Sequence, residues 1–400
     1  MSGDEFSDLS IWLSEGIYCA SKAEAFVSEL CSRIIKAGVP ISRMGAFIRI
    51  LHPNVIGRGF IWKKGSEVVT INDGVGTDEV ENFQSAPLSI VRETRQEVRY
   101  QLCLSHLADS ALAKGLRAEG ATDYIAFPFT FTNGAVHVIS WTTKEPGGFT
   151  SHHVASLRKL VPMFSRVAEI MSLRRTTTTL LDTYVGNQTG ELILAGQIQR
   201  GHTKLMDAVI WLSDLRGFTR MSERFPAVIV VEALNRYFGC QVPAINRQGG
   251  EILKFMGDGL LAVFPIDLET ENVPDVCARA LAAAREVSAS VEAIDYGDGL
   301  AMIDTLRFGM ALHVGKVLYG NIGGGNRMDF TCIGPAVNLA ARLEKLTGKL
   351  NLKIVASREF AHHGGPDWTD LGEFEVAGFA APERVFGLCE ATVPASVGRS

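Results

Sequence analysis

The chain has 400 residues, of which 46% are hydrophobic and 21% are charged, and its net charge at pH 7 is −5. This composition is typical of a globular protein, the length favours two domains, and the negative charge argues against non-specific nucleic-acid binding. The seven cysteines are scattered and contain no C-x-x-C pair, which disfavours a disulfide framework or a zinc site. Because no apolar run reaches about 20 residues and the N-terminus lacks a signal-peptide layout, we expect a cytoplasmic protein without a membrane partner.

Residues 1–150 are predicted to form one α+β domain. The spacing of apolar residues, together with strand-like alternation, predicts its elements in order. They are a helix at Ala23–Ala37, strands at Met44–Leu51 and Gly57–Lys64, a helical segment near Ser89–Lys114, and strands at Thr122–Phe131 and Ala135–Thr143. Asn133-Gly134 between the last two strands is a strong hairpin signal.

This order of elements, with a closing helix after the hairpin, resembles a GAF-type sensor domain. The resemblance implies a regulatory domain that responds to a small-molecule or protein signal, whose identity the sequence leaves open. Haem or metal ligands would have to come from Cys19, Cys103, His52, His106, His137, His152 and His153. None of these has ligand spacing such as H-x-x-x-H, so packed or solvated side chains are the favoured interpretation. Trp62 is likewise interpreted as a core aromatic and not as the wall of a pocket.

Residues 151–200 are predicted to be a helical linker. Its apolar positions follow an a/d heptad pattern: Leu157, Leu160, Phe164, Val167, Met171, Thr178 and Leu181. A closing helix packed on its own domain explains residues 151–165, and beyond them we favour a parallel dimer seam. Pro162 predicts a kink or a later helix start. Thr176–Thr179, a run of poor helix formers, predicts a soft segment through which the first domain regulates catalysis.

Two apolar runs in the second half each bring one carboxylate to a strand end or a turn. Val209–Leu212 has the pattern of a buried strand, and Asp214 follows it after one residue. Asp258 lies between two glycines, in the tight turn of a predicted hairpin. If the strands are neighbours, both carboxylates lie at one rim of a sheet and suit Mg²⁺ or Mn²⁺ bound together with substrate phosphates. A helix cap for Asp214 and a simple turn role for Asp258 are the alternatives.

Further elements follow from periodicity. They are helices at Ser222–Asn246, Asp275–Ala293 and Ala336–Lys345, and strands at Leu306–Val314, Lys316–Ile322 and Asp329–Gly334. The glycine-rich segment Gly320–Asn326 lacks the Gly-Lys-Ser/Thr of a P-loop and a helix start, so we interpret it as a hairpin tip, which disfavours a P-loop NTPase. Asn338 and Arg342 are four residues apart and share one helix face.

Three segments, S-D-L-R-G-F-T, L-K-F-M-G-D-G and T-C-I-G-P-A-V-N-L-A-A-R-L-E, resemble in order and spacing the signatures of the class III nucleotide cyclases. The resemblance covers about residues 180–390 and implies a ferredoxin-like α+β catalytic domain, assigned here to residues 201–400. It implies an adenylate cyclase that converts ATP to 3′,5′-cyclic AMP and pyrophosphate. The expected enzyme is a homodimer that uses Mg²⁺ or Mn²⁺, with about two ions in each active site.

The resemblance also assigns roles to residues. Metal binding falls to Asp214, Asp258 and the carbonyl of Leu215, and the phosphates would lie on backbone N–H groups near Gly217, Phe218 and Thr219. Purine recognition falls to Lys254 and Thr331, ribose orientation to Asn338, charge neutralisation on the α-phosphoryl group to Arg342, and a more loosely matched terminal-phosphate contact to Arg384. Lys254, Thr331, Asn338 and Arg342 are expected to complete the site of the opposite subunit.

The pair of Lys254 with Thr331 favours adenine. A lysine donates to adenine N1, whereas guanine-selective members of the family typically have an acidic residue at that position. A guanylate cyclase and a catalytically silent nucleotide-binding module are the alternatives. The silent module is disfavoured because Asp214, Asp258, Asn338 and Arg342 are all present.

Overall fold

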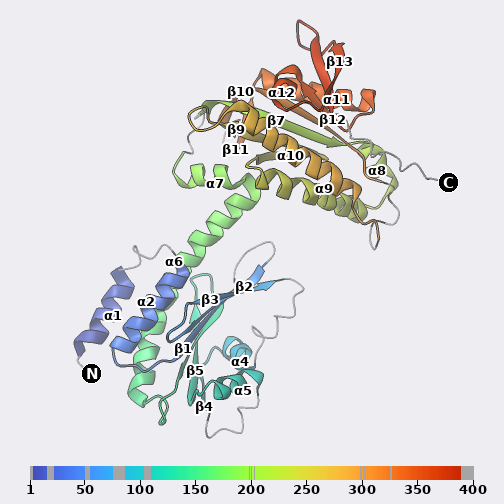
Figure 1. The fold of residues 1–400 in the computed structure, drawn as a ribbon. Helices are drawn as coiled ribbons and strands as arrows, with labels where there is room; N and C mark the ends of the chain where they lie inside the picture. Colours follow the sequence, from blue (N-terminus) through green and yellow to red (C-terminus); the bar gives the residue numbers. More distant parts are fainter. Residues whose placement is uncertain are drawn as a thin grey trace, which may run out of the picture. The chain divides into compact units, whose positions relative to one another are not determined.

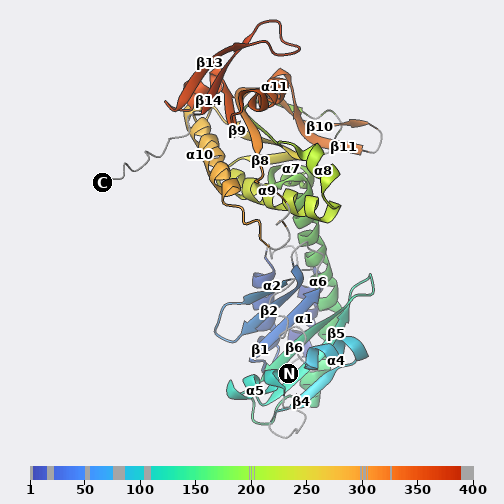
Figure 2. The ribbon, with the colours of Figure 1, turned by 90° about the vertical axis from the view of Figure 1, so that its right-hand side faces the viewer.

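The structure is a computed structural model that describes residues 3–15, 22–49, 55–74, 86–102, 110–197, 199, 201, 203–297, 300, 303, 305–324 and 327–388. The chain divides into two compact units, residues 1–180 and 181–400 (Figures 1 and 2). The division falls within one helix, α6 (Ser151–Val185). Among the described helices, none is long and apolar enough to cross a membrane.

The first unit contains a six-stranded antiparallel sheet in the order β3-β2-β1-β6-β5-β4. Its elements before α6 are α1 (Gly3–Glu15), α2 (Ala23–Lys36), β1 (Arg43–Arg49), β2 (Val55–Lys63), β3 (Val69–Gly74), α4 (Ala86–Thr94), β4 (Val98–Gln101), α5 (Ala111–Ala118), β5 (Asp123–Thr130) and β6 (Val136–Thr143). Helices α1, α2 and α6 pack on one face of the sheet, and α4 and α5 pack on the other (Figure 1).

The predicted hairpin is confirmed, because β5 and β6 pair in register around Asn133 and Gly134, and Gly134 has a φ of 83°. The prediction of a helical segment near Ser89–Lys114 is wrong in the middle of that range, where the chain forms strand β4. Val98 and Tyr100 alternate there and pack against the core under α4 and α5, which makes the segment a half-buried strand. Helix α1 and strand β3 were not predicted.

The predicted dimer seam along α6 is wrong for Val167 and Met171. Val167 is 1% exposed in the core of the first unit, and Met171 packs against the same core. Pro162 lies inside the helix, so the later start is also wrong. The threonine run is helical throughout. The hydroxyls of Thr177 and Thr178 donate to carbonyls four residues earlier, at 2.9 and 3.2 Å, and such bonds weaken a helix slightly.

His137 and Trp62 are core residues of the first unit. The His137 ring lies 4.0 Å from the ring of Phe131, its Nδ1 accepts from the backbone N–H of Arg49, and burial lowers its pKa to about 4. Trp62 is 5% exposed, as its interpretation as a core aromatic requires. The described residues contain no cluster of three or more His, Cys, Asp or Glu side chains arranged to hold a metal. Four candidate ligands lie outside the described residues: Cys19, His52, Cys103 and His106.

The second unit contains an eight-stranded sheet in the order β13-β14-β12-β10-β7-β9-β8, with β11 paired to β10. Its elements are α7 (Asn187–Leu194), β7 (Thr203–Leu215), α8 (Phe218–Arg224), α9 (Ala227–Arg247), β8 (Glu251–Met256), β9 (Gly259–Ile266), α10 (Val273–Glu292), β10 (Phe308–Gly324), β11 (Arg327–Ile333), α11 (Pro335–Leu350), β12 (Ile354–Ser357), α12 (Arg358–His363), β13 (Trp368–Phe374) and β14 (Glu383–Leu388). Among the described strands of this unit, only β10 and β12 pair in parallel, so the expected α+β domain with a mostly antiparallel sheet is observed. Helices α9, α10 and α12 pack on one face, and α11 packs on the other.

Two boundaries in this unit differ from prediction. The helix over Ser222–Asn246 is two helices, α8 and α9, because Pro226 disfavours a helical conformation in the residue before it. The two strands expected on either side of Gly315 are one continuous strand, β10. Gly315 allows α11 to approach that strand, since a Cβ added there would lie 2.6 Å from the Cβ of Ala336. The predicted hairpin at 320–326 is present as β10–β11, and residues 325 and 326 lie outside the described residues.

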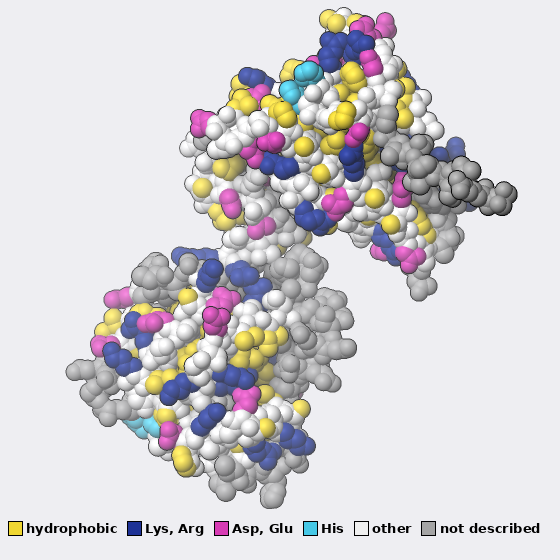
Figure 3. Space-filling model, in the orientation of Figure 1, with side chains coloured by type: hydrophobic (Ala, Val, Ile, Leu, Met, Phe, Trp, Pro, Cys, Tyr) yellow, Lys and Arg dark blue, Asp and Glu magenta, His cyan; other side chains and the backbone are white. Residues whose placement is uncertain are grey.

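Charged side chains of both signs are interspersed on the described residues of the face that Figure 3 shows. On the face shown in Figure 3, Lys and Arg side chains alternate with Asp and Glu side chains on the described residues. The described part of that face therefore carries no extended basic patch of the kind that binds nucleic-acid backbones.

Candidate active site

Asp214 and Asp258 are brought together by the pairing of β7 with β9. Ser213 pairs with Leu260, so Asp214 lies beside the turn that carries Asp258. A Cβ added to Gly259 would lie 3.2 Å from Asp214 Oδ1, so glycine leaves room for the carboxylate. The two aspartates therefore occupy one rim of the sheet, in the arrangement that the sequence predicts.

The environment of Asp214 opposes its ionisation. Burial and the neighbouring Asp258 carboxylate raise the pKa of Asp214 to about 7. Glu344 on α11, only 8% exposed, adds to this effect, and burial raises the pKa of Glu344 itself. A divalent cation would relieve the repulsion among these carboxylates, and hard oxygen donors are the ligands that Mg²⁺ and Mn²⁺ prefer. The residues present at this rim therefore fit a divalent metal site.

In the absence of divalent ions, the stability of the second unit is expected to fall as the pH rises through about 7. The pKa of Asp214 is raised in the folded state, so the stabilisation from its protonated form is complete below its unfolded pKa and disappears above the folded pKa. Thermal unfolding in EDTA from about pH 5.5 to about pH 8.5 measures this slope. Saturating Mn²⁺ should raise the melting temperature more at the alkaline end, because the cation binds the ionised carboxylates.

The Asp214→Asn variant should flatten this pH slope, and the matched Asp207→Asn variant, on the same strand, should not. Identical slopes in the wild type and in Asp214→Asn would contradict the assignment.

The chain turns sharply after the acidic pair. Leu215 is the last residue of β7, and Gly217 has a φ of 76°, a left-handed conformation that favours glycine. Phe218 and Thr219 then begin α8, so their backbone N–H groups have no acceptor within that helix. Arg216 is held elsewhere, because its Nη2 donates to the carbonyl of Thr347 at 2.9 Å. The backbone of this turn is thus the segment next to Asp214 that offers N–H groups to an anion.

Lys254 is connected to the strand that carries Thr331 by an ion pair with Asp329, a residue that was not predicted to belong to the site. The Lys254 ammonium pairs with Asp329 Oδ2 at 2.6 Å, and both side chains are nearly half exposed. A register shift between Ile252 and Lys254 marks a bulge in β8, a feature that redirects side chains. Asp329 and Thr331 are two apart on β11 and share one side of the strand, so this spacing is the signal that could have identified Asp329.

Asn338 and Arg342 lie on the exposed side of α11. Ala336 and Ala340 on the same helix pack against β7 residues, while the side chains of Asn338 and Arg342 are exposed. They are therefore available to groups outside the domain core. Arg384 is on β14, which β12 and β10 separate from β7, and its Nε donates to Asp370 at 2.8 Å. Within one chain, Arg384 is thus paired on a strand distant in sheet order from the acidic pair.

Residues 202–386 match the family model of the adenylate and guanylate cyclase catalytic domain. This region is a class III nucleotide cyclase catalytic domain. The cyclase domain contains the acidic pair, Lys254, Thr331 and both exposed residues of α11.

Several known proteins are similar to this chain. The terminal-differentiation specific adenylate cyclase of Dictyostelium discoideum is 31% identical over 37% of this chain and 7% of its own length. An uncharacterised protein of Mycobacterium tuberculosis is 24% identical over 86% of this chain and 59% of its own length. The chain therefore spans less than two thirds of each of these relatives.

Two solved structures resemble the cyclase domain. The adenylyl cyclase CyaB from P. aeruginosa is 27% identical with a TM-score of 0.43, covering 48% of this chain and 98% of its own. The guanylyl cyclase Cya2 is 28% identical with a TM-score of 0.41, covering 48% of this chain and 97% of its own.

Proposed function

We propose that the cyclase domain converts ATP to 3′,5′-cyclic AMP and pyrophosphate. The observation that carries this proposal is the pair of carboxylates on Asp214 and Asp258, which favours a divalent cation at one rim of the sheet. Incubation of the purified protein with ATP and Mn²⁺, followed by quantification of cyclic AMP and pyrophosphate, tests it. Release of free phosphate would overturn the proposal, and a preference for GTP would support a guanylate cyclase instead.

Each residue has a role in this reaction. Asp214, Asp258 and the Leu215 carbonyl would hold Mg²⁺ or Mn²⁺, which when bound supplies charge neutralisation and acidifies the ribose 3′-hydroxyl. That hydroxyl forms a bond to the α-phosphorus as the bond to pyrophosphate breaks, and its proton passes to Asp214 or to water. Asn338 orients the ribose, and Arg342 donates to the α-phosphoryl oxygens as negative charge develops. The chemistry depends on positioning and charge neutralisation, without a covalent intermediate.

The preference for ATP rests on Lys254. Its ammonium is a donor for adenine N1, and the Thr331 hydroxyl oxygen would accept a hydrogen bond from the exocyclic amine. Asp329 supports this role, because the ion pair holds the flexible lysine side chain on the side of the strand that carries Thr331. A fixed donor loses less conformational entropy when the base binds.

The Lys254→Ala variant is expected to have a kcat/KM for ATP about 10- to 100-fold lower, because a hydrogen bond to a charged group contributes about 1.5–3 kcal/mol. The kcat/KM for GTP should change less, since guanine N1 carries a hydrogen and cannot accept from lysine. Steady-state assays with both nucleotides measure the ratio. Lys204→Ala, an exposed lysine on β7, is the matched control. Equal losses for ATP and GTP would contradict the assignment.

We also propose that the active enzyme is a homodimer in which each site takes residues from both chains. Two observations support this: the exposure of Asn338 and Arg342, and the exposed apolar side chains of Ile170, Leu173 and Tyr184 on α6. The three α6 positions fit one a/d seam, which differs from the seam predicted from the sequence. Sedimentation analysis of Leu173→Glu against the wild type tests the seam, and an unchanged dimer would contradict it.

The first unit is proposed to be a GAF-type sensor that regulates the cyclase domain. Its support is the observed order of helices, strands and hairpin around a six-stranded sheet, together with the closing helix α6 that leads into the second unit. Removing the first unit should therefore alter the basal turnover of the cyclase domain.

A further inference from the structure

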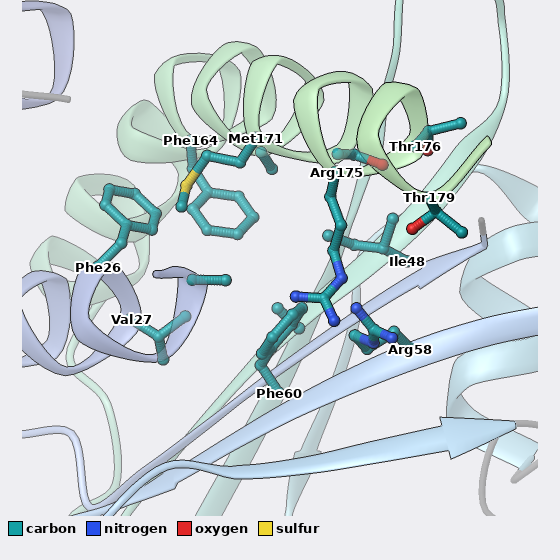
Figure 4. A pocket seen from close by; sticks show the side chains of 14 residues that line it. Phe26, Val27, Ile48, Arg58, Phe60, Phe164, Met171, Arg175, Thr176 and Thr179 are labelled. Atoms are coloured by element: carbon teal, nitrogen blue, oxygen red, sulfur yellow. The ribbon is translucent and has the colours of Figure 1, made fainter. Parts of the chain in front are cut away.

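A cavity of about 60 Å³ lies in the first unit between α2, α6 and the strands β1 and β2 (Figure 4). Most of its lining is apolar, with Phe26 from α2, Phe60 from β2, and Phe164 and Met171 from α6. The exceptions that matter are two arginines, Arg58 on β2 and Arg175 on α6, whose guanidinium groups converge at one end of the cavity in Figure 4. The cavity is therefore apolar along its length and cationic at one end.

Arg58 is a buried cation with an unused donor. Its side chain is 8% exposed, and its Nε donates to Asn72 Oδ1 at 2.8 Å. Its Nη1 is buried and has no hydrogen-bond partner within the described part of the chain. Burial lowers the pKa of Arg58, and the charge of Arg175 lowers it further. Buried donors on charged groups are nearly always paired, so this guanidinium calls for an acceptor.

The charged groups around the cavity carry a net positive charge that one bound anion would neutralise. Glu24 on α2 is the carboxylate whose charge acts on Arg58 and on Arg175, and it is already engaged, since it accepts from the Thr70 hydroxyl at 2.8 Å. Two guanidinium groups thus face one carboxylate. A second carboxylate would neutralise the cluster and accept from the free Nη1 of Arg58.

We propose that this cavity binds a short-chain aliphatic carboxylate, with its head group between Arg58 and Arg175 and its chain among Phe26, Phe164 and Met171. The planar forks of two arginines match carboxylate oxygens. The cavity volume of about 60 Å³ limits the chain to about two or three carbons, because it is well below the about 150 Å³ of an apolar cavity that binds benzene.

A ligand in this site would connect the sheet to the linker helix. Phe164, Met171 and Arg175 follow each other at helical spacing on one face of α6, and the helix continues beyond residue 180 into the second unit. A head group held by β2 and α6 together would restrain residues 171–180 against the first unit. This expectation concerns binding and local order, and it does not depend on the proposed cyclase activity.

Isothermal titration of the full chain with propionate tests the proposal. We expect saturable binding with one ligand per chain and at least tenfold weaker binding of 1-propanol, which has the same chain length and no charge. Arg58→Gln and Arg175→Gln should each weaken propionate binding at least tenfold, while Arg174→Gln, the adjacent exposed arginine that does not line the cavity, should bind as the wild type. Arg175 is exposed, so its variant keeps the test decisive even if Arg58→Gln does not fold.

Hydrogen exchange locates the ligand. Propionate should slow amide exchange in residues 171–180 of the wild type and leave Arg175→Gln unchanged. A series from acetate to dodecanoate should have its affinity maximum at a short chain. The proposal is overturned if no member binds saturably, if 1-propanol binds as tightly as propionate, if both cavity variants bind as the wild type, or if protection appears only outside α2, β2 and α6.

Discussion

Replacing Asp258 by alanine is expected to reduce nucleotide cyclisation by at least about a thousandfold, because it removes half of the carboxylate pair that we propose holds a divalent cation. The same change should not destabilise the protein in EDTA. Asp258 contributes to the raised pKa of Asp214, so its removal relieves repulsion in the folded state. The variant should therefore be at least as stable as the wild type without metal and should lose the stabilisation that Mn²⁺ provides. Cyclic AMP formation and thermal unfolding with and without Mn²⁺ measure both effects.

The combination of lost activity with retained stability separates a metal ligand from a structural residue. Asp207→Ala is the control, since this aspartate lies on β7 away from the paired acids and should retain activity and the response to Mn²⁺. If Asp258→Ala unfolds at a lower temperature in EDTA, or keeps its response to Mn²⁺, the aspartate serves the turn and not a metal.

Replacing Arg342 by alanine is expected to reduce kcat by about a hundredfold to a thousandfold, with little change in KM. The guanidinium is assigned to charge that develops on the α-phosphoryl group, so it contributes mainly in the transition state. Because the Arg342 side chain is exposed on α11, its removal should leave the fold and the melting temperature unchanged.

Lysine is expected to replace Arg342 poorly, since it lacks the planar fork that contacts two oxygens at once. Lys349→Ala, an exposed cation on the same helix, is the matched control and should retain wild-type kcat. A large rise in KM with an unchanged kcat would assign Arg342 to ground-state binding and contradict the role given to it.

The acidic pair could be predicted from the sequence because its signals are local. Each signal can be recognised from a few consecutive residues without knowledge of the fold. The first is a buried strand followed by Asp214, and the second is a Gly-Asp-Gly turn at Asp258. Glu344 and Asp329 were missed because their importance comes from neighbours in space. In the sequence, Glu344 is one polar residue on a helix and Asp329 is one residue of a strand. The fold gives them their importance, because α11 packs Glu344 near Asp214 and Asp329 pairs with Lys254.

The heptad along α6 misled for a related reason. Apolar spacing on a helix is the same whether the partner is the helix's own domain or a second chain, so Val167 and Met171 fitted a dimer seam while packing in their own core. The cavity between α2 and α6 could not be predicted either, because nothing in the sequence distinguishes Arg58 from an ordinary strand residue. Its burial and its free donor appear only when β2 faces the helices.

In the proposed homodimer, each active site takes Asp258 from one chain and Arg342 from its partner. Co-expression of Asp258→Ala and Arg342→Ala chains with two different affinity tags, followed by tandem purification, isolates hybrid dimers. Each hybrid should contain one intact site of two, so its activity per dimer should be about half that of the wild type, while each variant alone is nearly inactive. Hybrid dimers of verified composition that are no more active than either variant alone would contradict the shared site.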